Sequence, residues 1–135
     1  VRTINEVKYI NDSKATNINS VIVAINTFDQ PIVLILGGYN KGANFRLLLP
    51  HIKSSHVRDI VSYGDAGGQI NTALGDAVRS VQVTDLSSAV KKAQLMAAPG
   101  DIVLLSPGCA SYDEFSNFEE RGNHFKSIIK NIAIS

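Results

Sequence analysis

Short apolar runs alternate along this chain with segments whose apolar residues recur every three or four positions. The runs are rich in Val, Ile and Leu, and they lack the polar alternation of a sheet that faces water. They predict strands that are covered on both faces, which is typical of parallel sheets. The predicted strands are residues 7–10, 32–36, 57–61, 78–83 and 102–105, and residues 1–4 can add a sixth.

The segments between the strands predict amphipathic helices, because their apolar residues lie on one helical face. The predicted helices are residues 18–25, 45–52, 69–74, 86–93 and 115–132. Asp85 is placed to cap the start of the fourth helix, and Gly75 to end the third. Pro50 is expected to bend the second helix, because proline cannot donate the backbone hydrogen bond of a helix interior.

Strict alternation of strand and helix implies right-handed crossovers. We therefore expect an α/β fold: a doubly wound, mostly parallel, Rossmann-like sheet of five or six strands with helices on both faces. A chain of 135 residues is the size of one ordinary domain. Residues 1–135 are thus predicted to form a single domain around one core.

Bulk composition narrows the class of protein. A net charge of +1 at pH 7 gives no basis for a nucleic-acid partner or for binding to an anionic membrane surface. The single cysteine, Cys109, excludes an intrachain disulfide. The chain shows neither a signal peptide nor an apolar run of about 18 residues. We expect a monomer in the cytoplasm.

Polar and glycine-rich segments follow four of the predicted strands, at residues 12–16, 37–42, 64–68 and 106–111. In doubly wound sheets, ligands bind beyond the carboxyl ends of the strands. The four segments, which we call the rim, are therefore expected to lie together at one edge of the sheet. The segment at 64–68 is most simply a plain connection and is assigned no role.

Two rim segments carry lysines that could contact an anion. Lys14 lies beside Asp12 just before a predicted helix, where free backbone N–H groups favour phosphate. The plainer alternative is that Thr16 or Asn17 only caps the helix and that Lys14 is solvated. Residues 37–42 lack the pattern of a phosphate-binding loop. Tight turning explains their glycines but leaves Lys41 unexplained.

The last rim segment combines small residues with the start of the closing helix. Ser111 and the backbone N–H groups at that helix start form a natural cradle for a carboxylate. Phe115, Phe118 and Phe125 lie at core spacing, so their rings are expected to be buried. The charged run at residues 119–121 is most simply interpreted as a solvated helix face. The histidines have no metal-ligand spacing, and no metal site or catalytic residue is predicted.

Three of these segments resemble, in the same order, motifs in the C-terminal domain of the D-glutamate-adding members of the Mur ligase family. The matching stretches are Asn11-Asp12-Ser13-Lys14-Ala15-Thr16-Asn17, Leu36-Gly37-Gly38-Tyr39-Asn40-Lys41-Gly42, and Ser106-Pro107-Gly108-Cys109-Ala110-Ser111-Tyr112-Asp113-Glu114-Phe115 with Asn117-Phe118-Glu119-Glu120-Arg121-Gly122-Asn123. Gly108 and Tyr112 depart from the commonest family form without removing a charged or hydroxyl contact.

The resemblance implies an ATP-dependent ligase of peptidoglycan synthesis that adds D-glutamate to UDP-N-acetylmuramoyl-L-alanine. D-Glutamate would be held by Thr16, Lys41, Ser111 and Phe118, the last through its main chain. On the nucleotide side, Asp12 would contact the ribose and Lys14 the phosphates of ATP.

By the same resemblance, the phosphate-binding loop, the Mg²⁺ ligands, the UDP-binding domain and the central ATPase domain would lie outside this chain. The chain alone is thus expected to bind rather than to catalyse. Two alternatives stay open. One is the equivalent domain of another Mur ligase or of a folylpolyglutamate synthase, and the other is a free-standing α/β binding module.

Overall fold

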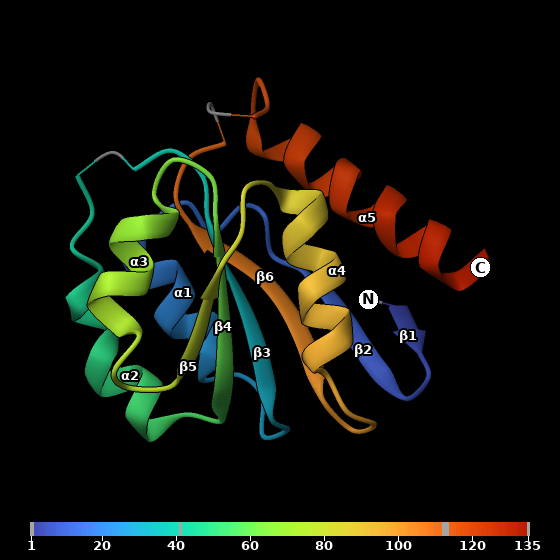
Figure 1. Ribbon diagram of the computed structural model, residues 1–135, viewed down its shortest axis with the longest axis horizontal. Coiled ribbons are helices and arrows are strands. Elements are labelled where there is room, and N and C mark those ends of the chain that lie inside the picture. The colour runs from blue at the N-terminus through green and yellow to red at the C-terminus, as the bar shows by residue number, and fades with distance from the viewer. Residues whose placement is uncertain (1, 41, 112–113, 135) are drawn as a thin grey trace.

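The computed structural model describes residues 2–40, 42–111 and 114–134, which form one six-stranded sheet between two layers of helices (Figure 1). The strands are β1 Arg2–Ile4, β2 Val7–Asn11, β3 Ile32–Gly37, β4 Val57–Tyr63, β5 Arg79–Gln82 and β6 Ile102–Gly108. The helices are α1 Ile18–Ile25, the 3₁₀ turn η1 Phe45–Leu48, α2 Leu49–Ser54, α3 Gly67–Leu74, α4 Leu86–Met96 and α5 Phe118–Ile134.

The sheet has the strand order β1-β2-β6-β3-β4-β5. All neighbouring strands are parallel except β1, which pairs antiparallel with β2. The two strands are joined by Asn5 and Glu6, whose φ angles of 52° and 65° are those of a tight two-residue hairpin. The predicted doubly wound, mostly parallel fold is confirmed, and residues 2–4 supply its sixth strand.

Both faces of the central strands β3 and β6 are covered, as predicted, whereas the edge strands β1 and β5 are exposed or half-buried along their length. In β3, Leu34 and Leu36 pack in the core layer beneath α1, α2 and α3, whereas Val33 and Ile35 pack in the layer beneath α4 and α5. All four side chains are fully buried. Figure 1 shows the two helical layers on either side of the strands.

Polar caps fix where the helices begin. The side chain of Asn17 accepts a hydrogen bond from the backbone of Ser20 at the start of α1 (2.9 Å). Asp85 accepts one from the backbone of Ser88 at the start of α4 (2.8 Å), as predicted. That backbone N–H and the Ser88 side chain lower the pKa of Asp85 against the opposing effect of burial. Pro50 lies in the first turn of α2, so the predicted second helix is divided into η1 and α2 just before this proline.

The closing helix begins at Phe118, three residues later than the apolar spacing predicted. The side chain of Asn117 accepts a hydrogen bond from the backbone N–H of Glu120 (2.8 Å) and so caps α5. Phe115 therefore lies in the preceding turn, with its ring centroid 5.3 Å from that of His124. The prediction was wrong here because a polar cap, rather than the apolar stripe, decides the helix start.

A charged cluster lies at the amino ends of the strands, opposite the rim. Asp59 is only 2% exposed, and its carboxylate accepts hydrogen bonds from Arg79 (2.7 and 3.1 Å) and Arg58 (3.1 Å). Arg58 also pairs with Asp101 (2.7 Å). Burial alone would raise the pKa of Asp59, but the hydrogen bonds and charges of the two arginines outweigh it and hold that pKa below its ordinary value.

The lowered pKa of Asp59 predicts how stability depends on pH. An unfolded Asp titrates near about pH 4, so the contribution of Asp59 is fully present above that pH and is lost as the pH falls through its lower folded pKa. Asp59→Asn should lower the free energy of unfolding at pH 7 by about 1–3 kcal/mol. Urea unfolding at pH 7 and pH 3 measures both effects. If the variant and the native chain lose the same stability on acidification, Asp59 is not the titrating group.

Candidate functional site

The four rim segments meet at the carboxyl end of the sheet, as predicted (Figure 1). In the register of the sheet, Gly37 at the end of β3 lies beside Gly108 of β6 and Tyr63 of β4. Asn11, the last residue of β2, lies beside Leu105. Because these parallel strands end at nearly the same level, the loops that follow them share one edge.

The loop after β2 is tied to the end of β6. The backbone N–H of Asp12 donates to the carbonyl of Leu105 (2.7 Å), and the hydroxyl of Ser106 donates to Oδ2 of Asp12 (3.0 Å). The carbonyl of Ala15 accepts from the N–H of Gly108 (2.8 Å). The carboxylate of Asp12 is thus held in a fixed position, whereas Lys14 and Thr16 are exposed and free to contact a ligand.

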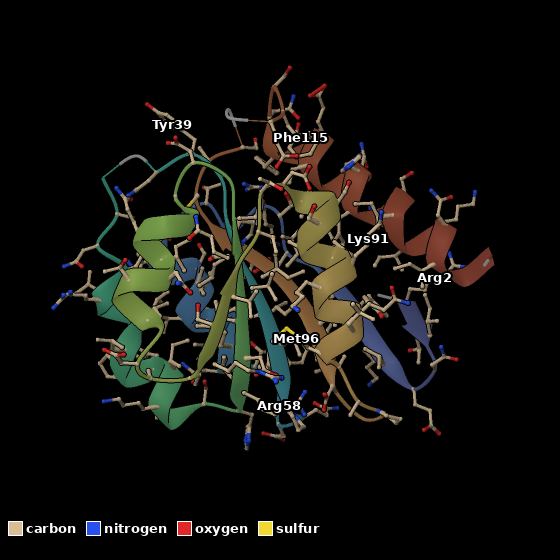
Figure 2. All side chains as sticks on the ribbon, viewed as in Figure 1. Arg2, Tyr39, Arg58, Lys91, Met96 and Phe115 are labelled. Atoms are coloured by element: carbon tan, nitrogen blue, oxygen red, sulfur yellow. The ribbon has the colours of Figure 1, made fainter. Side chains whose placement is uncertain are left out.

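The loop after β3 is joined to the segment after β6 by a pair of backbone hydrogen bonds. Tyr39 and Ala110 exchange N–H to carbonyl bonds of 2.8 and 3.1 Å. The carbonyl of Gly38 accepts from Ala66 (2.9 Å), which adds the loop after β4. Figure 2 shows Tyr39 at this edge of the molecule. Lys41, predicted to bind D-glutamate, lies outside the described residues.

The segment after β6 brings Ser111 and Phe118 to the same edge of the sheet. Ser111 is buried there, whereas Phe118 is exposed. Ser111 is 2% exposed, and its carbonyl accepts the N–H groups of Glu114 and Phe115. Phe118 is 41% exposed, so the prediction that its ring is buried was wrong. The reason is its place in the first turn of α5, where there is no preceding turn for the side chain to lie on.

Two hollows open beside the loop after β2. The larger, of about 560 Å³, is lined by Asp12 and Lys14 together with apolar residues of α1 and its C-terminal turn. The smaller, of about 310 Å³, is lined by Lys14, Phe118 and Lys126 among others. Lys14 lies between the two, so the structure brings it close to both Asp12 and Phe118. Thr16 and Ser111 line neither hollow.

The smaller hollow has the chemistry of an anion site. Lys14 and Lys126 supply positive charge, and the first N–H groups of α5 have no partner within the helix. Glu119 also lines this hollow and opposes an anion there. The arrangement can bind a carboxylate or phosphate.

Sequence reasoning missed Arg121, which it placed on a solvated helix face. The side chain of Arg121 is fully buried and hydrogen bonds to Ser13 of the loop after β2. The spacing could have indicated this burial. Residue 121 falls three after Phe118 and four before Phe125, on the apolar stripe of the helix. An arginine on such a stripe must be buried against a polar partner.

Other candidate residues do not assemble into a site. Cys109 is buried in the core layer beneath α1, whereas His124 of α5 lies within 3.0 Å of the hydroxyl of Ser87 in α4. Within the described part of the chain, no three His, Cys, Asp or Glu side chains form a group that could hold a metal ion. Nor is any helix there long and apolar enough to cross a membrane.

A protein-family model described as "Mur ligase, glutamate ligase domain" matches residues 1–109 of the chain. The chain belongs to this family. The crystal structure of a domain of a UDP-N-acetylmuramate:L-alanyl-gamma-D-glutamyl-diaminopimelate ligase from Haemophilus ducreyi covers 98% of this chain and 94% of that domain, with a TM-score of 0.52 and 14% identity. At that identity the likeness shows the fold alone.

Several curated relatives are named UDP-N-acetylmuramoylalanine–D-glutamate ligase. The one from Chlamydia caviae is 46% identical over 91% of this chain and 29% of its own length. Those from Salinibacter ruber and Pseudomonas fluorescens are 41% and 42% identical over 98% of this chain, and 29% and 30% of their lengths. The Mur ligase domain described here thus spans less than a third of these relatives.

Gly38 is a rim residue that should not tolerate a side chain. A Cβ there would lie 2.3 Å from the carbonyl oxygen of Ala110, at a φ of +119°. Gly42, at a φ of +93°, has nothing within 4 Å of its Cβ position and is the matched control. Gly42→Ala should cost only backbone strain of about 1–2 kcal/mol, and Gly38→Ala a further 1–3 kcal/mol or so from the clash.

Chemical denaturation of the two glycine variants measures this difference in the free energy of unfolding. Equal losses in both variants would mean that the Gly38 backbone does not hold the close approach to Ala110.

Proposed function

We propose that this chain is the C-terminal, amino-acid-binding domain of a ligase that adds D-glutamate to UDP-N-acetylmuramoyl-L-alanine in peptidoglycan synthesis. The observation that carries the proposal is the identity of 41–47% to ligases of that name across 91% or more of the chain. The convergence of the predicted binding segments on one rim supports it. The names of these relatives favour D-glutamate over the substrates of other Mur ligases.

The residues on the nucleotide side fit their proposed ligand. The carboxylate of Asp12, held by Ser106, is a suitable acceptor for a ribose hydroxyl, and Lys14 beside it is an exposed cation that can meet phosphate. When bound, ATP with Mg²⁺ supplies the phosphoryl group that activates the carboxylate of the UDP-linked substrate for attack by the amine of D-glutamate. We propose that the Mg²⁺ ligands and the UDP-binding groups lie outside this chain.

The proposed D-glutamate side combines fixed dipoles with one cation. The backbone at Phe118, at the N-terminus of α5, and the hydroxyl of Ser111 would hold the side-chain carboxylate, with Lys41 as its charged partner and Thr16 nearby. Ser111 is nearly buried. A hydrogen bond made there is shielded from water, where it contributes more to binding than at an open surface. We also propose that the whole enzyme is cytoplasmic and works as a monomer.

Lys41 and Ser111 give the direct test of the amino-acid site. In a full-length ligase that carries this chain, Lys41→Ala should raise the KM for D-glutamate by about 10- to 100-fold, through loss of one charge-assisted contact. Ser111→Ala should act in the same direction but more weakly, because it removes a neutral donor and leaves the α5 amides in place. Steady-state kinetics with each substrate varied in turn measures these constants.

The control for Lys41 is Lys53→Ala, an exposed lysine at the end of α2 that precedes β4 and so lies away from the rim. Lys53→Ala should leave the KM values for ATP, D-glutamate and UDP-N-acetylmuramoyl-L-alanine unchanged. Neither Lys41→Ala nor Ser111→Ala should alter the KM for UDP-N-acetylmuramoyl-L-alanine. An unchanged KM for D-glutamate in both rim variants would remove these residues from the site.

The chain by itself should have no ligase or ATPase activity. Phosphoryl transfer depends on positioning and on charge stabilisation by Mg²⁺, and we propose that the groups responsible lie elsewhere in the enzyme. A coupled assay for ADP release should therefore stay at background with the pure chain. Sustained ATP turnover that is abolished by Lys14→Ala would contradict this part of the proposal.

A further inference from the structure

Arg121 is the one fully buried arginine among the described residues, and its guanidinium lies between two segments of the rim. It extends from the first turns of α5, and the exposed fraction of the residue is 0%. Its Nε donates to Oγ of Ser13 (3.0 Å) and its Nη2 donates to the carbonyl of Ser13 (2.8 Å). The planar fork of the guanidinium thus grips both the side chain and the backbone of one residue.

Ser13 also hydrogen bonds to the first residue of α5. Its hydroxyl accepts from Arg121 and donates to the carbonyl of Phe118 (2.7 Å). Gly122 makes room for the contact, because a Cβ there would lie 2.9 Å from the side chain of Asn11. Arg121, Ser13 and the carbonyl of Phe118 form a closed set of hydrogen bonds, which we call the α5 clamp.

The third corner of the guanidinium points to the other half of the rim. A Cβ built on Gly38 would lie 3.0 Å from Nη1 of Arg121, so this nitrogen lies close to the loop after β3. Among the described residues it has no hydrogen-bond partner, and no described carboxylate forms an ion pair with Arg121. A buried cation without a carboxylate is costly. A long apolar residue would fill the same place without that cost, so stability alone does not explain an arginine here.

The segments that meet at Arg121 are those to which the proposed function assigns ligands. Ser13 lies between Asp12 and Lys14 of the nucleotide side, and Phe118 belongs to the D-glutamate side. Both Lys14 and Phe118 line the 310 Å³ hollow. A displacement of about 1 Å between such groups is enough to weaken binding strongly. The clamp fixes their separation.

We propose that Arg121 is a positioning residue that holds the start of α5 against the Asp12–Thr16 loop, and so sets the spacing of the nucleotide and D-glutamate groups. The proposal rests on the proposed function for what the two sides bind. It does not depend on that function for the clamp itself. Arg121 touches no substrate in this role and acts through Ser13 and Phe118.

The test uses Arg121→Met and Arg121→Lys in a full-length ligase that carries this chain. Arg121→Met should raise the KM for D-glutamate and for ATP by about 10-fold or more each, with the KM for the UDP-linked substrate unchanged within about 2-fold. Arg121→Lys keeps the charge but not the fork, so its KM values should lie between those of Arg121→Met and the native enzyme. Ser13→Ala in the Arg121→Met background should add little, because the two residues share one interaction.

Asp59→Asn is the matched control, because it destabilises the fold at the opposite end of the sheet. Loss of folded enzyme alone lowers the apparent kcat and leaves KM unchanged, which is the result expected for the control. Hydrogen exchange gives a readout that needs no substrate. Arg121→Met should speed amide exchange in residues 11–16 and 117–122, and Asp59→Asn should not do so selectively.

The outcomes separate the two proposals. If the native enzyme does not use D-glutamate, the proposed function fails, and hydrogen exchange still decides whether the clamp exists. Unchanged exchange in Arg121→Met would overturn the clamp. Faster exchange with unchanged KM values would overturn its role in spacing the ligands. Native KM values in Arg121→Lys would show that charge alone is needed and would also overturn the positioning role.

Discussion

The return of the last strand to the middle of the sheet is the constraint on which the rim depends. Because β6 pairs with β2 on one side and β3 on the other, the segment that follows it is hydrogen bonded to both neighbouring loops. Ser106 and Gly108 hold the loop after β2, and Ala110 holds the loop after β3. Segments far apart in sequence become one surface through these contacts.

Sequence reasoning could predict the parts of this arrangement that follow from apolar pattern and strand polarity. Runs rich in Val, Ile and Leu predicted the strands, and the carboxyl ends of parallel strands placed four loops at one edge. The pattern failed where a polar group overrides apolar spacing. Asn117 starts α5 three residues late, which leaves Phe118 exposed, and Arg121 occupies an apolar position because Ser13, 108 residues away in sequence, is its partner. Sequence patterns that compare only neighbouring residues cannot identify so distant a partner.

The proposed site residues also include features that the sequence predicts and features that only the folded structure shows. Asp12 is held by hydrogen bonds that only the folded chain shows, and the hydroxyl of Ser106 directs its carboxylate. Asn17 does cap α1, as the plainer interpretation of that motif required, yet the cap leaves Lys14 free to line both hollows. A helix cap and a binding role are therefore compatible in one short loop. For Lys41, Ser111 and Thr16, the proposed roles come from the family resemblance.

The buried charges at the two ends of the sheet differ in their partners. At the amino end, Asp59 is satisfied by Arg58 and Arg79, and the cluster is complete without a ligand. At the carboxyl end, the buried guanidinium of Arg121 donates to a hydroxyl and a carbonyl, and no carboxylate among the described residues pairs with it. In a medium of low dielectric constant, such a charge is felt over a longer range than at the surface. It therefore favours the approach of anions to the rim, the class to which both carboxylates and phosphates belong.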